Sequence, residues 1–206
     1  MRVLIIESGR ADDFYNDELD GPSTLQLLKL QGYKPDIRYA LDRTHLKRAI
    51  AEATASRYRV VHLSCHGSST GIFLGDLTKV SWASLATYFQ GGRYCPAVLV
   101  MSACKGASSG ISEAFADCDD RPEIIFGSRK SLNYDDYAVA WAILYRRLDM
   151  KSLRRAAQLA LREICAVVDP SFMYRRWDDD SERYLNYPHA GVQYEIKQTG
   201  DGEDDD

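Results

Sequence analysis

Short apolar runs alternate along this chain with segments in which apolar residues recur every three or four positions. Uninterrupted apolar runs are typical of strands covered on both faces, and the longer periodicity is typical of amphipathic helices. A hairpin is expected between the third strand and the third helix, with its turn near Gly75 and Asp76. The pattern predicts strands over 2–8, 34–41, 58–65, 95–104 and 122–128, and helices over 23–33, 42–57, 81–92, 110–118, 135–148 and 151–168.

The order of these elements predicts the fold class. Strands that alternate with helices favour a mostly parallel sheet, because each helix carries the chain back to the edge where the next strand begins. We therefore expect an α/β protein, a three-layer sandwich with helices on both faces of a central sheet. No low-complexity linker divides the chain, so we expect one domain over 1–200, with a last strand over 191–198 and an acidic tail over 201–206.

Composition narrows the class of protein. The 206 residues carry a formal net charge of −4, which argues against a general nucleic-acid binder. No stretch reaches the roughly 18 apolar residues of a membrane span, and the first residues turn polar too early for a signal peptide. The five cysteines form no C-x-x-C pair and have no zinc-ligand spacing. We therefore expect a cytoplasmic protein with no metal and no other cofactor.

A histidine and a cysteine stand at the ends of two predicted strands. His66 and Gly67 follow the strand over 58–65, and Cys104 ends the strand over 95–104. Ligands bind beyond the carboxyl ends of the strands in an open parallel sheet, so the fold can bring the imidazole and the thiol to one edge. The sequence does not show that these two strands are neighbours. Each residue alone is weak evidence, since a cysteine that ends a buried strand is most often a small core residue.

A thiol and an imidazole at one edge support nucleophilic acyl chemistry. A free thiol has a pKa of ~8.5 and is mostly protonated at neutral pH, and a nearby imidazole can accept its proton. The thiolate of Cys104 would attack a carbonyl carbon, and protonated His66 would donate a proton to the leaving amine. The backbone N–H groups of Gly67 and Cys104 are the candidate donors to the oxyanion.

Two segments carry a resemblance to a known family. VVHLSCHG (60–67) and AVLVMSACKG (97–106) resemble the His-Gly and Cys turns of the caspase-like cysteine peptidases, and most of all those of CHAT domains. The resemblance runs from the first strand to Val168 and includes the segments over 71–85, 122–148 and 152–164. It implies a cysteine endopeptidase that cleaves a protein substrate, with His66 as general base and acid and Cys104 as nucleophile.

The resemblance also implies a context. Many CHAT proteins carry helical repeats that control the peptidase or recruit partners, and this sequence has none. Activation is therefore expected from a separate regulatory protein, a small-molecule ligand or an oligomer, in a bacterial defence or signalling system. The polar segment over 9–23 and the aromatic, charged segment over 169–191 are candidate partner surfaces.

Substrate preference stays open at this point. The position two before the cysteine is acidic in metacaspases and helps to bind a basic side chain, but it is Ser102 here. Asp135 and Asp136 are further candidates for a pocket that takes Arg or Lys, although at least one is expected to cap the helix that follows. Arg129 and Lys130 favour an acidic substrate residue instead.

Two other functions compete with the peptidase. A binding or scaffold module could retain the fold without catalysis, and the presence of both His66 and Cys104 argues against it. A nucleotide-binding, flavodoxin-like domain would need a glycine-rich phosphate turn after the first strand. The sequence there, ESGRADD (7–13), is acidic and unlike such a turn.

Overall fold

A block of parallel strands forms the centre of the computed structural model, which describes residues 1–188. The main sheet has the order β2-β1-β3-β6-β7-β8-β9. The first five strands in this order run parallel, and β8 and β9 are added antiparallel at one edge. The predicted α/β sandwich with a mostly parallel sheet is confirmed. The strands are β1 (Arg2–Ser8), β2 (Lys34–Tyr39), β3 (Val60–Ser68), β6 (Val98–Ser102), β7 (Ile124–Ser128), β8 (Phe172–Asp178) and β9 (Arg183–Tyr187).

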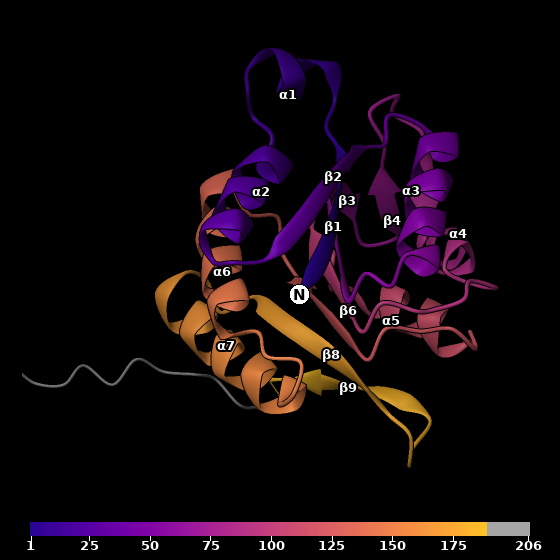
Figure 1. Ribbon diagram of the computed structural model, residues 1–206, viewed down its shortest axis with the longest axis vertical. Helices are drawn as coiled ribbons and strands as arrows, with labels where there is room; N and C mark the ends of the chain where they lie inside the picture. The colour runs from indigo at the N-terminus through magenta and orange to yellow at the C-terminus, as the bar shows by residue number, and fades with distance from the viewer. Residues whose placement is uncertain (189–206) are drawn as a thin grey trace, which may run out of the picture.

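Helices cover both faces of this sheet (Figure 1). Alternate residues of each strand point to opposite faces, so Val61 packs into one core and Val60 into the other. Within residues 1–188, no helix is both long and apolar enough to cross a bilayer. One layer holds α3 (Arg43–Ala55), α4 (Trp82–Tyr88) and α5 (Ser109–Ala116), and the other holds α2 (Asp20–Leu30), α6 (Tyr134–Arg147) and α7 (Leu153–Val167).

The third strand is longer than its apolar run predicts. It continues through His66 to Ser68, and its last residues leave the main sheet to pair antiparallel with β4 (Gly71–Phe73). The strand β4 pairs in turn with β5 (Lys79–Ser81), which is the predicted hairpin. His66 and Gly67 therefore belong to a strand and not to a turn, because β4 supplies backbone partners beyond the end of β1 and β6.

Two polar segments are more ordered than their sequence suggests. The segment after β1 contains the short helix α1 (Ala11–Tyr15), and α2 begins at Asp20 and not at Ser23. Pro22 fits in the first turn of α2, where a missing N–H leaves no intrahelical bond unmade. Within the segment over 169–191, residues 172–187 form the β8–β9 hairpin, which was not expected. The strand predicted over 191–198, the tail over 201–206 and the end of the domain lie outside the described residues.

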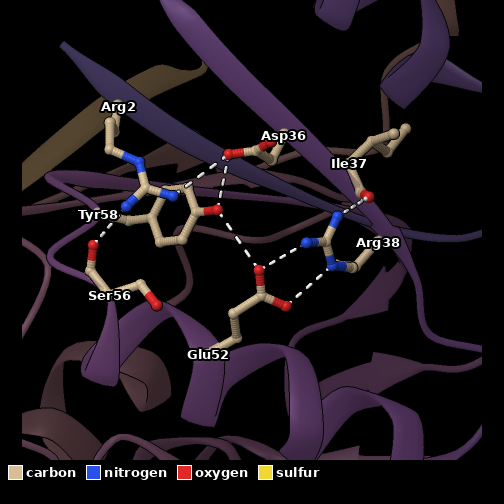
Figure 2. A network of polar contacts seen from close by, with 7 residues as sticks. All are labelled: Arg2, Asp36, Ile37, Arg38, Glu52, Ser56 and Tyr58. Carbon is tan, nitrogen blue, oxygen red and sulfur yellow. Dashed lines mark hydrogen bonds and ion pairs between the residues drawn. The ribbon is translucent and has the colours of Figure 1, made fainter.

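A polar network closes the exposed edge of the sheet at β2 (Figure 2). The Tyr58 hydroxyl donates to Asp36 at 2.7 Å, and the guanidinium of Arg2 lies 4.0 Å from the centre of the Tyr58 ring. Arg38 makes two hydrogen bonds to Glu52 of α3, at 2.8 and 2.6 Å. Burial, assisted by the bond to Asp36, raises the pKa of Tyr58 to about 12. Charged side chains along an edge strand discourage pairing with another chain.

A buried polar cluster lies between the sheet and the layer of α2 and α6. The ring of His62 is fully buried, with Nε2 3.1 Å from Asp20 Oδ2 and Nδ1 3.0 Å from the Tyr145 hydroxyl. Thr24 donates a further hydrogen bond to Asp20 at 3.1 Å. Burial alone would raise the pKa of Asp20, but its hydrogen bond and charge interaction with His62 hold that pKa below its ordinary value. Asp20 is therefore buried as a paired carboxylate, which is how buried charges are tolerated.

Glu7 belongs to the same cluster and behaves differently. It is 2% exposed at the end of β1 and accepts the Gly21 N–H at 2.6 Å. Burial raises the pKa of Glu7 to about 7, and nearby Asp20 adds to the rise, whereas the bonds from Gly21 and Ser64 oppose it. The carboxyls of Glu7 and Asp20 thus lie side by side with pKa values displaced in opposite directions.

We predict that Glu7 makes stability depend on pH between 4.5 and 7. The folded chain holds the proton of Glu7 more tightly than the unfolded chain does, so the free energy of unfolding falls as pH rises from 4.5 to about 7. The loss is about 3 kcal/mol. Glu7→Gln keeps an oxygen acceptor for Gly21, and should remove most of this slope and raise stability at pH 8.

Urea unfolding at pH 5 and pH 8 checks this prediction. Glu163→Gln, at an exposed ion pair with Arg147, is the control and should keep the wild-type slope. Asp20 affects stability in a separate pH range. Its pKa is lowered in the folded protein, so the stability that its carboxylate contributes is lost only as pH falls below 3.8. An unchanged slope in Glu7→Gln would contradict the assignment.

Candidate active site

The backbones of the two predicted turns touch. Strands β3 and β6 are parallel neighbours, and their last aligned pair is Ser64 with Ser102. Beyond it, a β-carbon placed on Gly67 would lie 2.4 Å from the Cys104 carbonyl oxygen and 3.3 Å from its nitrogen. No side chain fits there, so glycine is required for the close approach of β3 to the cysteine loop. The structure therefore brings the sequences around His66 and Cys104 together at the carboxyl edge of the sheet.

A carboxylate that the sequence analysis did not single out binds the histidine. The Nε2 of His66 lies 2.7 Å from Oδ2 of Asp13, whose side chain comes from α1. The same oxygen accepts the Arg10 N–H at 2.6 Å, a bond that holds the start of α1. Asp13 is 8% exposed although its helix is short and polar. The only signal in the sequence was the unusual length of the polar segment after the first strand.

Backbone hydrogen bonds hold the loop that carries Cys104. The N–H of Lys105 donates to the Lys130 carbonyl, and the N–H of Ala107 donates to the Ser128 carbonyl, both at 3.0 Å. Lys105 has a φ of 57°, a left-handed conformation that is uncommon for a residue with a side chain. The N–H of Cys104 takes part in none of the turn bonds of this loop. It is thus a candidate to donate to a ligand.

Cys104 and His66 lie on the side of the sheet that α6 covers. The Cys104 sulfur is 4.0 Å from the carbonyl oxygen of Leu132, in the segment that leads into α6. The Tyr137 hydroxyl donates to the Ala103 carbonyl at 2.8 Å. Burial, and then the proximity of Cys104, raise the pKa of Tyr137. Burial also raises the pKa of Tyr134 one turn earlier, and the next largest cause is Asp13. The first turns of α6 therefore lie close to both halves of the candidate site.

The charges around the site are of both signs. Glu7, Asp20 and Glu18 join Asp13 in raising the pKa of Tyr134, so carboxyl groups dominate the side of the site next to α1 and α2. Exposed Arg129 and Lys130 lie in the segment after β7, on the side of the cysteine loop. Carboxyl groups and exposed basic side chains therefore lie on different sides of the candidate site.

The predicted substrate-binding residues have different surroundings. Ser102 is 5% exposed, and its hydroxyl accepts the Trp141 Nε1–H at 2.8 Å beneath the site. Asp136 accepts the Asn133 N–H at 3.2 Å in a capping box at the start of α6, as the sequence suggested for at least one aspartate. Asp135 is exposed beside it. Among the described residues, no group of three or more His, Cys, Asp or Glu side chains is arranged to hold a metal ion.

We predict that Gly67→Ala distorts the cysteine loop. The new methyl group overlaps the Cys104 carbonyl, so the loop must shift, at a cost of about 1–3 kcal/mol in the free energy of unfolding. Hydrogen exchange at the Lys105 and Ala107 amides should become faster. Gly32→Ala is the control, because Gly32 has a φ of 80° with open space around it at the opposite end of the sheet. It should lower stability without changing exchange in the loop, and equal exchange in both variants would refute the prediction.

Comparisons with known proteins bear on the fold. No family model matches this sequence, and no curated protein matches it. Among solved structures, the Arg specific cysteine proteinase gingipain R (RGPB) is similar with a TM-score of 0.49 and 16% identity over 71% of this chain and 36% of that chain. The complex of Porphyromonas gingivalis RgpB pro- and mature domains is similar with a TM-score of 0.47 and 16% identity, over 82% and 44% of the two chains.

A third solved structure is similar over a larger share of both chains. The secreted C11 cysteine protease iotapain from Bacteroides thetaiotaomicron is similar with a TM-score of 0.51 and 12% identity, over 88% of this chain and 66% of that chain. The chain thus spans between about a third and two thirds of the length of these proteins. At such identities the likeness concerns the fold, and together with the strand order it shows that this chain has a caspase-like fold.

Proposed function

We propose that this protein is a cysteine endopeptidase with Cys104 as nucleophile, His66 as general base and acid, and Asp13 as the group that orients His66. The observation that carries the proposal is the contact between Gly67 and Cys104, which places the imidazole and thiol segments at one edge of the sheet. The bond between Asp13 and His66 supports it, because a carboxylate on one ring nitrogen fixes the tautomer of the other.

The proton transfers follow from that bond. When Nε2 donates to Asp13, Nδ1 of His66 has no hydrogen and can accept the proton of the thiol. The thiolate of Cys104 attacks the carbonyl carbon of the scissile peptide bond, and the imidazolium then protonates the leaving amine. Water attacks the thioester in the second half, with the imidazole again as base, and the thiolate leaves. Asp13 stabilises the imidazolium in both halves.

The oxyanion of each tetrahedral intermediate needs fixed donors. The N–H of Cys104, which makes none of the loop's turn bonds, is the first candidate. The N–H of Gly67 is the second, because Gly67 lies against the backbone of Cys104 at the same edge of the sheet. One donor from each strand end would stabilise the charge where it develops.

The resemblance to CHAT domains supplies the setting of the proposal. The substrate is a protein, and a separate regulatory protein or a small-molecule activator switches the peptidase on, in a bacterial defence or signalling system. All five cysteines are free thiols, a state that a reducing cytoplasm preserves. Binding of nucleic acid or membrane is not part of the proposal.

Labelling with an irreversible, thiol-directed peptidyl probe tests the nucleophile. The protein is incubated with the probe together with the proteins that are encoded next to it in its genome. We expect the wild type to be labelled at one site and Cys104→Ala to lose the label. Cys118→Ala is the matched control, because Cys118 is also a partly exposed thiol, and it should keep the label. A proteomic comparison of cells that express wild type or Cys104→Ala then reports the residue before each cut. Wild-type protein that stays unlabelled would favour the alternative, a caspase-fold binding or scaffold module.

Asp13→Asn tests the orienting carboxylate. The amide keeps an oxygen for the Arg10 N–H but cannot hold the imidazolium, so the rate of probe labelling should fall by a factor on the order of 10²–10⁴, as when the carboxylate of a catalytic triad is neutralised. Asp12→Asn, one residue earlier in α1 and exposed, should label at the wild-type rate. Equal rates in the two variants would remove Asp13 from the mechanism.

A further inference from the structure

A buried arginine lies behind the cysteine loop, in the strand that pairs with β7. Arg175 is in β8 and is 7% exposed. Within residues 1–188, no carboxylate lies within ion-pair distance of its guanidinium. Burial lowers the pKa of Arg175; the nearby charge of Glu113 opposes this effect and that of Arg129 adds to it, both to a smaller extent. A buried charge without a counter-ion is costly, so the protein tolerates it through the hydrogen bonds that the guanidinium makes.

The guanidinium binds the loop through one carbonyl. Its Nη2 and Nε donate to the carbonyl oxygen of Ala107 at 2.9 and 3.3 Å. Its Nη1 donates to the side-chain oxygen of Asn186, in β9. The two ends of the fork thus join the β8–β9 hairpin to the segment three residues after Cys104.

The bond to the Ala107 carbonyl adds to other hydrogen bonds that hold the loop of Cys104. The Ala103 carbonyl accepts from the Gly106 N–H and the Tyr137 hydroxyl, and the Lys105 carbonyl accepts from the Ser108 N–H at 3.0 Å. The Ala107 carbonyl has Arg175 as its partner. Gly127 leaves room for the loop above β7, because a β-carbon there would lie 3.0 Å from the Ala107 nitrogen.

We propose that Arg175 is a positioning residue for the reaction of Cys104: its guanidinium holds the Ala107 carbonyl and so fixes the orientation of the loop that carries the thiol and its N–H. The proposal rests on the proposed function, in which Cys104 is the nucleophile. It makes the β8–β9 hairpin part of the catalytic machinery through one side chain, although no residue of the hairpin is placed among the reacting groups.

Arg175→Met tests the positioning role. The thioether fills similar space but makes no hydrogen bond, so the variant removes the buried charge and leaves the Ala107 carbonyl and the Asn186 side-chain oxygen without this partner. We expect the maximal inactivation rate by the peptidyl probe to fall between about 10- and 100-fold, as for small misplacements of a reacting group. The probe concentration for half-maximal rate should change less than about twofold. Arg175→Lys, which keeps one donor, should recover part of the rate.

Arg176→Met is the matched control. Arg176 follows Arg175 in the same strand and points to the other face, where its guanidinium lies 5.5 Å from the centre of the Tyr187 ring. This variant should keep the wild-type inactivation rate. Two results would overturn the proposal. One is an unchanged inactivation rate in Arg175→Met, and the other is an equal fall in rate in Arg175→Met and Arg176→Met when the two variants are equally destabilised.

Hydrogen exchange gives a readout that does not depend on peptidase activity. The Lys105 and Ala107 amides should exchange at least about tenfold faster in Arg175→Met and at the wild-type rate in Arg176→Met. If the probe fails to label Cys104 of the wild type, the proposed function fails, and the exchange rates still report whether Arg175 fixes the loop. Unchanged exchange at both amides would overturn the positioning role whatever the outcome of labelling.

Discussion

The parallel pairing of β3 with β6 is the constraint on which the candidate site depends. It sets the sequences around His66 and Cys104 side by side, and the absence of a side chain at Gly67 allows the two backbones to touch. The other groups of the site lie around the contact between Gly67 and Cys104. The carboxylate of Asp13 reaches the imidazole from α1, and the segment that leads into α6 contacts the sulfur through the Leu132 carbonyl.

Polar groups are buried beneath this edge at some cost to stability. His62 and Asp20 are hydrogen-bonded to one another. Burial raises the pKa of Glu7 to about 7. Arg175 is a cation whose hydrogen-bond partners are a backbone carbonyl and the side-chain amide of Asn186. Such groups are poor stabilisers compared with well-packed apolar side chains. Their common property is position, since each contacts an element that carries or supports a member of the candidate site. The cost is thus concentrated where geometry matters most for the proposed chemistry.

The central strands and helices could be predicted because their cause is local. Continuous apolar runs need burial on both faces, and amphipathic segments need one buried face, so periodicity alone predicts the sandwich. The positions of Gly67 and Cys104 near strand ends could also be predicted, because each follows a largely apolar run. The features that the sequence did not reveal depend on partners distant in the chain. Asp13 is ordered by its bond to His66, and the segment around Arg175 becomes a strand because β7 offers it an edge.

The strand β3 changes partners along its length, and this has a consequence for how the site can vary. Its early residues are fixed by the main sheet, but His66 is aligned with Phe73 of the small β4–β5 ribbon. Cys104, in contrast, takes its orientation from β7, α6 and β8. The two groups are therefore aimed by separate parts of the molecule. Changes in the ribbon can therefore move His66 and leave Cys104 in place, and changes around the cysteine loop can do the reverse, so the two partners of the proposed reaction can vary independently.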